Sequence, residues 1–271
     1  MSDHSTYFEA TGGGLVLSNA ILLYRIETTR GVRHSGSAAF ASMHAIEHDG
    51  DGPPTIAAGT PLTRAHLREW TEALGRTVPP KLLPANVLVA HPDMLAWWVP
   101  EQVRTAYFDL SRPPAGLQAL SRRTNVVVPY PPHLFVATRS GLSVYALPAN
   151  ERPTADTPVL HSPVLNVYLD GQLCWGNIPR PQELTIASMA AFESAVFDSW
   201  STHPNIGQEQ TVTGKCGLVR LWDDLAARKA KRFPVRRLRH FDPAARRQGS
   251  RRARAAERIT VGQIVAWRAG R

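Results

Sequence analysis

Short apolar runs alternate with turn-forming residues along most of the chain, a pattern that predicts many strands. Clusters of Gly, Pro, Asn, Asp and Ser separate the runs, as expected for the loops between strands. The residues Ser140-Gly141 lie between two of these runs and predict a hairpin. The predicted strands cover residues 15–17, 21–26, 38–46, 86–90, 95–100, 103–108, 126–128, 134–138 and 142–146.

Three segments have apolar residues at helical spacing instead. For the first, Thr60 is the predicted N-cap, Pro61 the first helical residue and Gly75 the stop. The second and third helices are predicted over residues 183–200 and 218–231. Strands together with a few helices indicate an α+β fold.

Basic and acidic residues are unevenly distributed along the chain. Residues 228–271 carry fifteen Lys and Arg against two acidic residues, whereas the rest carries sixteen against twenty. The few apolar residues of this tail before 259–267 indicate that much of it is disordered. Such a tail could bind nucleic acid weakly through phosphate charge, recruit an acidic partner, or be a solvated extension.

Composition narrows the class of protein. The hydrophobic share of 43% and the charged share of 20% are typical of a folded chain. No apolar run approaches the roughly 20 residues that span a bilayer, and the N-terminus does not read as a signal peptide. We therefore expect a cytoplasmic protein that does not insert into a membrane.

Cysteine is scarce, with only Cys174 and Cys216 in the chain. In a reducing compartment a disulfide is not expected, and no C-x-x-C pair is present to bind zinc. Cys216 follows Gly214-Lys215, but the spacing of a phosphate-binding loop is absent and the segment is interpreted as a turn. The sequence indicates neither a metal site nor a cofactor.

Cys174 follows a tight turn. Residues 166–169 are extended, Asp170-Gly171 predicts the turn, and 175–179 are turn-forming again. A cysteine at the exit of such a turn tends to be partly exposed, where a thiolate can form and be reached. This placement favours a nucleophile over a buried apolar residue.

The segment around Cys174 resembles the ubiquitin-conjugating enzymes. Those enzymes have a His-Pro-Asn tripeptide, an apolar-aromatic pair and a Gly turn, with the thioester-forming Cys eight residues after the Asn. Here Val164-Leu165-Asn166 stands in place of the tripeptide, Cys174 keeps the spacing, and Val167-Tyr168 and Gly171 are in register. The Pro-rich residues 128–135 are similar to a strand of the same family. The resemblance implies an antiparallel β-meander with flanking helices.

More narrowly, the chain resembles the protein B family of the PRTRC cassette, a bacterial and often plasmid-borne group. The residues that carry this resemblance are 97–100, 166–174 with Gly176, and 197–203. It implies three partners: a ThiF-like activating enzyme that uses ATP, a ubiquitin-like protein, and a JAB-type peptidase. The predicted organisation is a β-rich region with one helix at 1–115, a conjugating-enzyme-like core at 116–227, and a basic tail at 228–271.

The resemblance also implies roles for individual residues. Cys174 would hold the ubiquitin-like protein as a thioester. Asn166 would donate to the oxyanion of the tetrahedral intermediate, although an Asn here could equally cap the turn. The candidate base does not come from the resemblance, because His203-Pro204-Asn205 lies downstream of the Cys and is not the family's tripeptide. His203 could fold back near the sulfur after the second predicted helix, with a role at a helix end as its alternative, and His161 is a weaker candidate.

Two other functions stay open at this point. A thiol hydrolase using Cys174 with His203 would cleave a peptide or thioester bond instead of carrying a modifier. A non-catalytic plasmid-maintenance protein would act through the basic tail alone, by binding nucleic acid.

Overall fold

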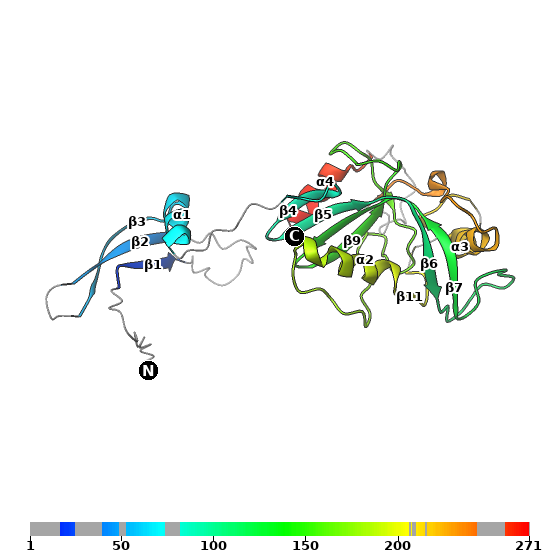
Figure 1. Ribbon diagram of the computed structural model, residues 1–271, viewed down its shortest axis with the longest axis horizontal. Coiled ribbons are helices and arrows are strands. Elements are labelled where there is room, and N and C mark those ends of the chain that lie inside the picture. Colours follow the sequence, from blue (N-terminus) through cyan, green and yellow to red (C-terminus); the bar gives the residue numbers. More distant parts are fainter. Residues whose placement is uncertain are drawn as a thin grey trace, which may run out of the picture. The chain divides into compact units, whose positions relative to one another are not determined.

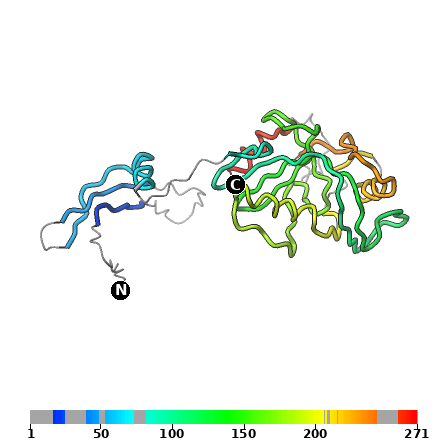
Figure 2. Tube along the Cα trace, in the orientation of Figure 1, coloured from blue at the N-terminus to red at the C-terminus, as the bar shows by residue number. Residues whose placement is uncertain are grey.

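The structure, a computed structural model, describes residues 17–24, 40–48, 53–73, 82–205, 207, 210–214, 216–242 and 258–270. The chain divides into two compact units, Met1–Lys81 and Leu82–Arg271. Both are α+β, and their elements can be followed along the chain in Figure 2.

The first unit is an antiparallel sheet with one helix. Its strands are β1 (Asn19–Tyr24), β2 (Phe40–Glu47) and β3 (Thr55–Pro61), in the order β1-β2-β3, and they are followed by α1 (Arg64–Ala73). Here the predicted helix start is wrong, because Thr60 and Pro61 pair with β2 as the end of β3. The helix begins after Thr63, whose hydroxyl accepts a hydrogen bond from the backbone N–H of His66 at 3.3 Å. The predicted stop, Gly75, lies outside the described residues.

The second unit contains two sheets (Figure 1). The five-stranded antiparallel sheet has the order β10-β9-β8-β5-β4, and the three-stranded sheet has the order β11-β6-β7, with β11 parallel to β6. The strands are β4 (Val87–His91), β5 (Met94–Val99), β6 (Gln102–Phe108), β7 (Thr124–Tyr130), β8 (His133–Thr138), β9 (Gly141–Ala146), β10 (Leu160–His161) and β11 (Trp200–Ser201). The helices are η1 (Ile186–Ser188), α2 (Met189–Phe197), α3 (Gly217–Ala227), η3 (Val235–Arg237) and α4 (Val261–Ala269).

Alternation along the strands gives the five-stranded sheet two apolar faces. Trp97 and Phe135 stack at 5.1 Å on the face that also packs against Phe192 of α2. Their neighbours on the opposite face pack against α4, through Val261 and Ile264. The sheet is therefore a buried middle layer between helices, which explains why its strands read as nearly continuous apolar runs.

The sequence predicted most of these strands. The segments predicted from residue 86 to residue 146 fall on β4 to β9, and the hairpin at Ser140-Gly141 is confirmed by the pairing Thr138↔Gly141. In the first unit the segments 21–26 and 38–46 fall partly on β1 and β2, and the rest of them lies outside the described residues. Residues 15 and 16 also lie outside the described residues.

Two predicted helices are shorter in the structure. The second begins as the short η1 and continues as α2, and Trp200 belongs to β11 instead. The third, α3, ends at Ala227, two residues before Lys229, which has a left-handed φ of 49°. A non-glycine residue in that conformation cannot continue a right-handed helix.

The boundary between the units lies at 81/82, whereas the sequence suggested 115/116. The reason is strand pairing: β5 pairs with β8 along its length and places Trp97 in the core with no exposed surface. Residues 82–115 thus supply strands to both sheets of the second unit.

The basic tail is largely folded where it is described. Phe233, Leu238 and Phe241 are buried, and α4 packs on the sheet. The expectation of disorder is wrong for 232–242, because the apolar residues Phe233, Leu238 and Phe241 reach the core. It did not cover the apolar stretch 259–267, most of which lies in α4. Residues 243–257 lie outside the described residues.

Candidate functional site

Residues 166–174 form a short hairpin next to β9. The N–H of Cys174 donates to the carbonyl of Asn166 at 2.7 Å, and the N–H of Tyr168 donates to the carbonyl of Gln172 at 2.8 Å. These two bonds flank the bridge pair Val167↔Leu173. The hairpin in turn joins the sheet, because the N–H of Leu173 donates to the carbonyl of Leu142 at 2.8 Å.

This pairing sorts the hairpin side chains onto two faces. Val167 and Leu173 are opposite each other and are buried at 1% and 4% exposure. In an antiparallel pair the neighbouring positions point the other way, so Asn166, Tyr168, Gln172 and Cys174 share the outer face. The apolar pair anchors the hairpin in the core and thereby presents a row of polar side chains that includes the thiol.

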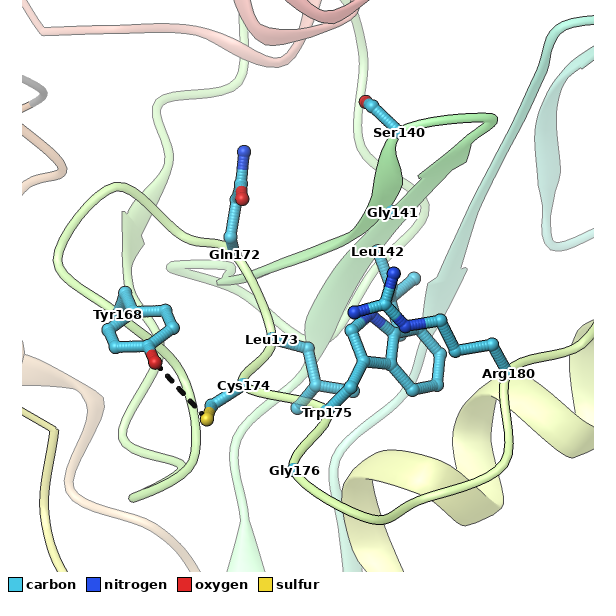
Figure 3. A pocket seen from close by; sticks show the side chains of 10 residues that line it. All are labelled: Ser140, Gly141, Leu142, Tyr168, Gln172, Leu173, Cys174, Trp175, Gly176 and Arg180. Carbon is cyan, nitrogen blue, oxygen red and sulfur yellow. Dashed lines mark hydrogen bonds between the residues drawn. The ribbon is translucent and has the colours of Figure 1, made fainter.

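Cys174 is partly buried and is not in a disulfide. The hydroxyl of Tyr168 donates a hydrogen bond to its sulfur at 3.1 Å (Figure 3). A sulfur that already accepts a hydrogen bond is better prepared to carry negative charge. Tyr168 belongs to the predicted motif, but its contact with the sulfur was not predicted; the alternation of side chains around the Asp170-Gly171 turn could have indicated it.

A hollow of about 710 Å³ opens beside Cys174. It brings together all three predicted site residues, since Asn166 and His203 line it as well. Its wall is completed by residues of the 175–179 turn, of α2, and of the segment around β11. The remaining lining residues are Asp109, Trp175, Gly176, Asn177, Ile178, Pro179, Ala191, Ser194, Ala195, Asp198, Ser199, Trp200, Thr202 and Asn205.

Asn166 and His203 differ in how they are held. The side-chain amide of Asn166 donates to the carbonyl of Trp200 at 3.1 Å, which ties the hairpin to β11. This amide carries a second N–H. His203 is exposed, and its Nδ1 lies 2.9 Å from the hydroxyl of Thr202. Its ring is therefore reachable from solvent.

Cys174 also lines a smaller hollow of about 290 Å³ (Figure 3). Tyr168, Gln172, Cys174 and Arg180 line it, and the guanidinium of Arg180 lies 5.4 Å from the ring centre of Trp175. Cys174 thus borders two hollows, one wide and mostly apolar and one small and polar.

The other candidates lie elsewhere. His161 on β10 is buried, and burial lowers the pKa of its imidazole to about 4, with Asp242 opposing that shift. Its Nε2 accepts the backbone N–H of Asp242 at 3.3 Å, which indicates a neutral core histidine. Cys216 is exposed at the N-terminus of α3 and lines neither hollow.

In the described part of the chain, no three His, Cys, Asp or Glu side chains are grouped so as to hold a metal ion. Nor does that part contain a helix with the length and apolar character needed to cross a membrane.

The fold and the two hollows define an α+β protein with a partly buried thiol on a sheet-anchored hairpin. The family model of prokaryotic E2 family D matches residues 66–241, well over half of the chain, and the chain belongs to this family. Membership implies a ubiquitin-conjugating-like function, with a ubiquitin-like protein and an activating enzyme as the general kinds of partner. A search of curated proteins and a search of solved structures found no match.

Proposed function

We propose that Cys174 carries a ubiquitin-like protein as a thioester, received from a ThiF-like activating enzyme. The observation that supports this most directly is the shared hollow, which is lined by Cys174, Asn166 and His203. Family membership supports the same reaction class. A carrier of this kind needs an accessible thiolate, an oxyanion donor and room for an acceptor.

The reaction is a transthiolation. The Cys174 thiolate attacks the carbonyl carbon of the thioester on the activating enzyme, forming a tetrahedral intermediate with a negatively charged oxygen. That intermediate collapses, the new C–S bond to Cys174 remains, and the thiolate of the activating enzyme leaves. The proton released by the Cys174 thiol ends on this departing thiolate, so that atoms and charge balance.

Within this reaction, Tyr168 stabilises the attacking sulfur through its 3.1 Å hydrogen bond. Asn166 uses one N–H to hold Trp200 and offers the other to the oxyanion. His203 is the base that removes a proton, from the Cys174 thiol or from the acceptor amine that later attacks the thioester.

We place the protein in a PRTRC cassette of the bacterial cytoplasm, where thiols stay reduced. Residues 97–100, 166–174 and 197–203 support this assignment. A JAB-type peptidase would then release the modifier. The gene neighbourhood tests this part, since neighbours that encode none of these partners would contradict it.

A loading assay tests the carrier role. The protein, the ThiF-like enzyme, the ubiquitin-like protein and ATP are mixed and separated on a non-reducing gel. We expect an adduct that thiols remove, that Cys174→Ala abolishes, and that the matched control Cys216→Ala retains. If the activating enzyme loads itself but no adduct forms, the carrier role is wrong.

The same assay separates the alternatives. Release of free modifier without an adduct, dependent on both Cys174 and His203, would identify a thiol hydrolase. Salt-sensitive DNA binding that persists in Cys174→Ala, without an adduct, would favour the nucleic-acid role of the basic tail.

A further inference from the structure

The C-terminal helix α4 lies beyond the region that the family model matches, yet it contacts the hairpin of Cys174. Val261 and Ile264 pack α4, labelled in Figure 1, against the sheet. The last turn of this helix carries Arg268, which is only 5% exposed. A buried arginine in a helix outside the matched region calls for a physical reason, because burying a guanidinium is costly unless it is well bonded.

Arg268 is bonded to the turn of the hairpin. Its Nε and Nη2 donate to the hydroxyl of Tyr145 at 3.1 and 2.9 Å, and Nη2 also donates to the backbone carbonyl of Asp170 at 2.5 Å. Among the described residues no carboxylate forms an ion pair with it. The charge is therefore held by a phenol, by a main-chain carbonyl of the turn, and by the ring of Trp267, whose centre lies 4.4 Å from the guanidinium carbon.

The turn fits closely against the same tyrosine. Gly171 has a φ of +84°, and a Cβ on it would lie 2.4 Å from the Tyr145 ring. On the sheet side, the N–H of Val144 donates to the carbonyl of Gly171 at 2.8 Å. The turn is therefore hydrogen-bonded on two sides: Gly171 accepts from the sheet, and Asp170 accepts from Arg268.

We infer that Arg268 is a positioning residue for Cys174, and that α4 is a working part of the thioester site. The inference rests on the proposed carrier function. Arg268 fixes one end of the hairpin at Asp170, while Asn166 fixes the other end at Trp200. With both ends fixed, Tyr168 and Cys174 keep the register that brings hydroxyl and sulfur together.

A planar guanidinium is required here. Its fork reaches the Tyr145 hydroxyl and the Asp170 carbonyl at once, which a lysine ammonium at the same position cannot do with the same geometry. We call the hydrogen bonds of Arg268 to Tyr145 and Asp170 the clamp. Without the clamp, the hairpin keeps the hydrogen bond from Leu173 to Leu142, and its apolar side chains stay buried in the core. Loss of the clamp should therefore loosen the site without unfolding the protein.

The test compares Arg268→Met and Arg268→Lys with Arg258→Met, an exposed arginine just before the same helix. For Arg268→Met we expect the kcat of loading to fall about tenfold, with the KM for the charged activating enzyme unchanged. Arg268→Lys should recover part of the rate, and Arg258→Met should load as the wild type does. Melting temperatures should stay within about 5 °C of wild type.

A second measurement does not depend on conjugation. Hydrogen exchange at the amides of residues 168–174 and alkylation of Cys174 are followed in the same variants, and Tyr145→Phe serves where Arg268→Met folds poorly. Faster exchange and altered Cys174 alkylation, with Cys216 unchanged, would support the clamp. Wild-type loading and exchange in Arg268→Met would overturn it, as would a KM effect alone. A wild-type protein that fails to load would refute the carrier function while these measurements still test the clamp.

Discussion

At the scale of single residues, the hydroxyl of Tyr168 donates a hydrogen bond to the sulfur of Cys174, and we expect this bond to affect the reactivity of the thiol. Tyr168→Phe removes this donor and keeps the ring, so the thiolate loses one hydrogen bond. A hydrogen bond to a charged group contributes about 1.5–3 kcal/mol, part of which water restores in the variant. We expect alkylation of Cys174 near neutral pH to slow by about 3- to 10-fold, measured by mass spectrometry of the labelled peptide.

The second thiol supplies the internal control for this experiment. Cys216 is exposed and lies outside both hollows, so Tyr168→Phe should leave its alkylation unchanged. Slowing at both thiols would indicate a general change in the protein, and no slowing at Cys174 would contradict a role for the hydroxyl.

Two glycines near the thiol allow a matched comparison. Gly171→Ala introduces a Cβ 2.4 Å from the Tyr145 ring at a φ of +84°, whereas at Gly176, with a φ of +49°, nothing lies within 4 Å. Strained backbone and overpacking together should destabilise Gly171→Ala by at least about 2 kcal/mol, against about 1 kcal/mol for Gly176→Ala. Urea unfolding measures both, and equal losses would mean that Tyr145 does not hold the turn.

At the scale of elements, the sequence predicted what depends on local pattern. The strands from β4 to β9 and the Ser140-Gly141 hairpin follow from apolar runs and turn residues. The hairpin that carries Cys174 agrees with the turn predicted at Asp170-Gly171, and the role of Cys174 remains a prediction from the family spacing. Arg268 could not be predicted, because its contacts with Tyr145 and Asp170 join residues 123 and 98 positions apart. The start of α1 was missed because pairing with β2 outweighs the local capping signal.

The side chain of Asp223 joins α3 to the loop before β7, and it predicts that the stability of the fold depends on pH. Asp223 is 2% exposed, and its carboxylate accepts the backbone N–H groups of Gln118, Ala119 and Leu120 at 2.7–2.8 Å. Burial alone would raise the pKa of this carboxyl, but the three N–H bonds and nearby Arg220 lower it below 3.8 overall. A lowered pKa stabilises the fold at higher pH, and this contribution is lost as the pH falls through the folded pKa.

Asp223→Asn should therefore destabilise the protein by about 2 kcal/mol at pH 7, because an amide oxygen accepts fewer bonds and its N–H₂ opposes the backbone donors. The difference from wild type should shrink as the pH falls below about 4. Urea titrations across this range measure it. The neighbouring exposed Asp224→Asn is the matched control and should change little. A difference that stays constant with pH would contradict the ionised state of Asp223.

At the scale of the whole molecule, the two units differ in what they bury. Every buried apolar side chain among the described residues belongs to the second unit. In the described part of the first unit the buried residues are Ser42 and His44, 2.7 Å apart between hydroxyl and ring nitrogen. Because apolar burial is the main driving force of folding, the first unit should be much the less stable of the two.

Hydrogen exchange measures this difference strand by strand. Amides of β1, β2 and β3 should exchange at least about 100-fold faster than those of β5, β8 and β9, since local opening follows local stability. Leu95→Ala, at a core position with 1% exposure, should remove about 2–5 kcal/mol from the second unit. In this variant, amide exchange in β5, β8 and β9 should accelerate, whereas exchange in β1, β2 and β3 should stay as in the wild type. The reason is that each unit has its own unfolding equilibrium. Acceleration of both groups in Leu95→Ala would show instead that the chain unfolds as one cooperative body, and that the first unit draws its stability from the second.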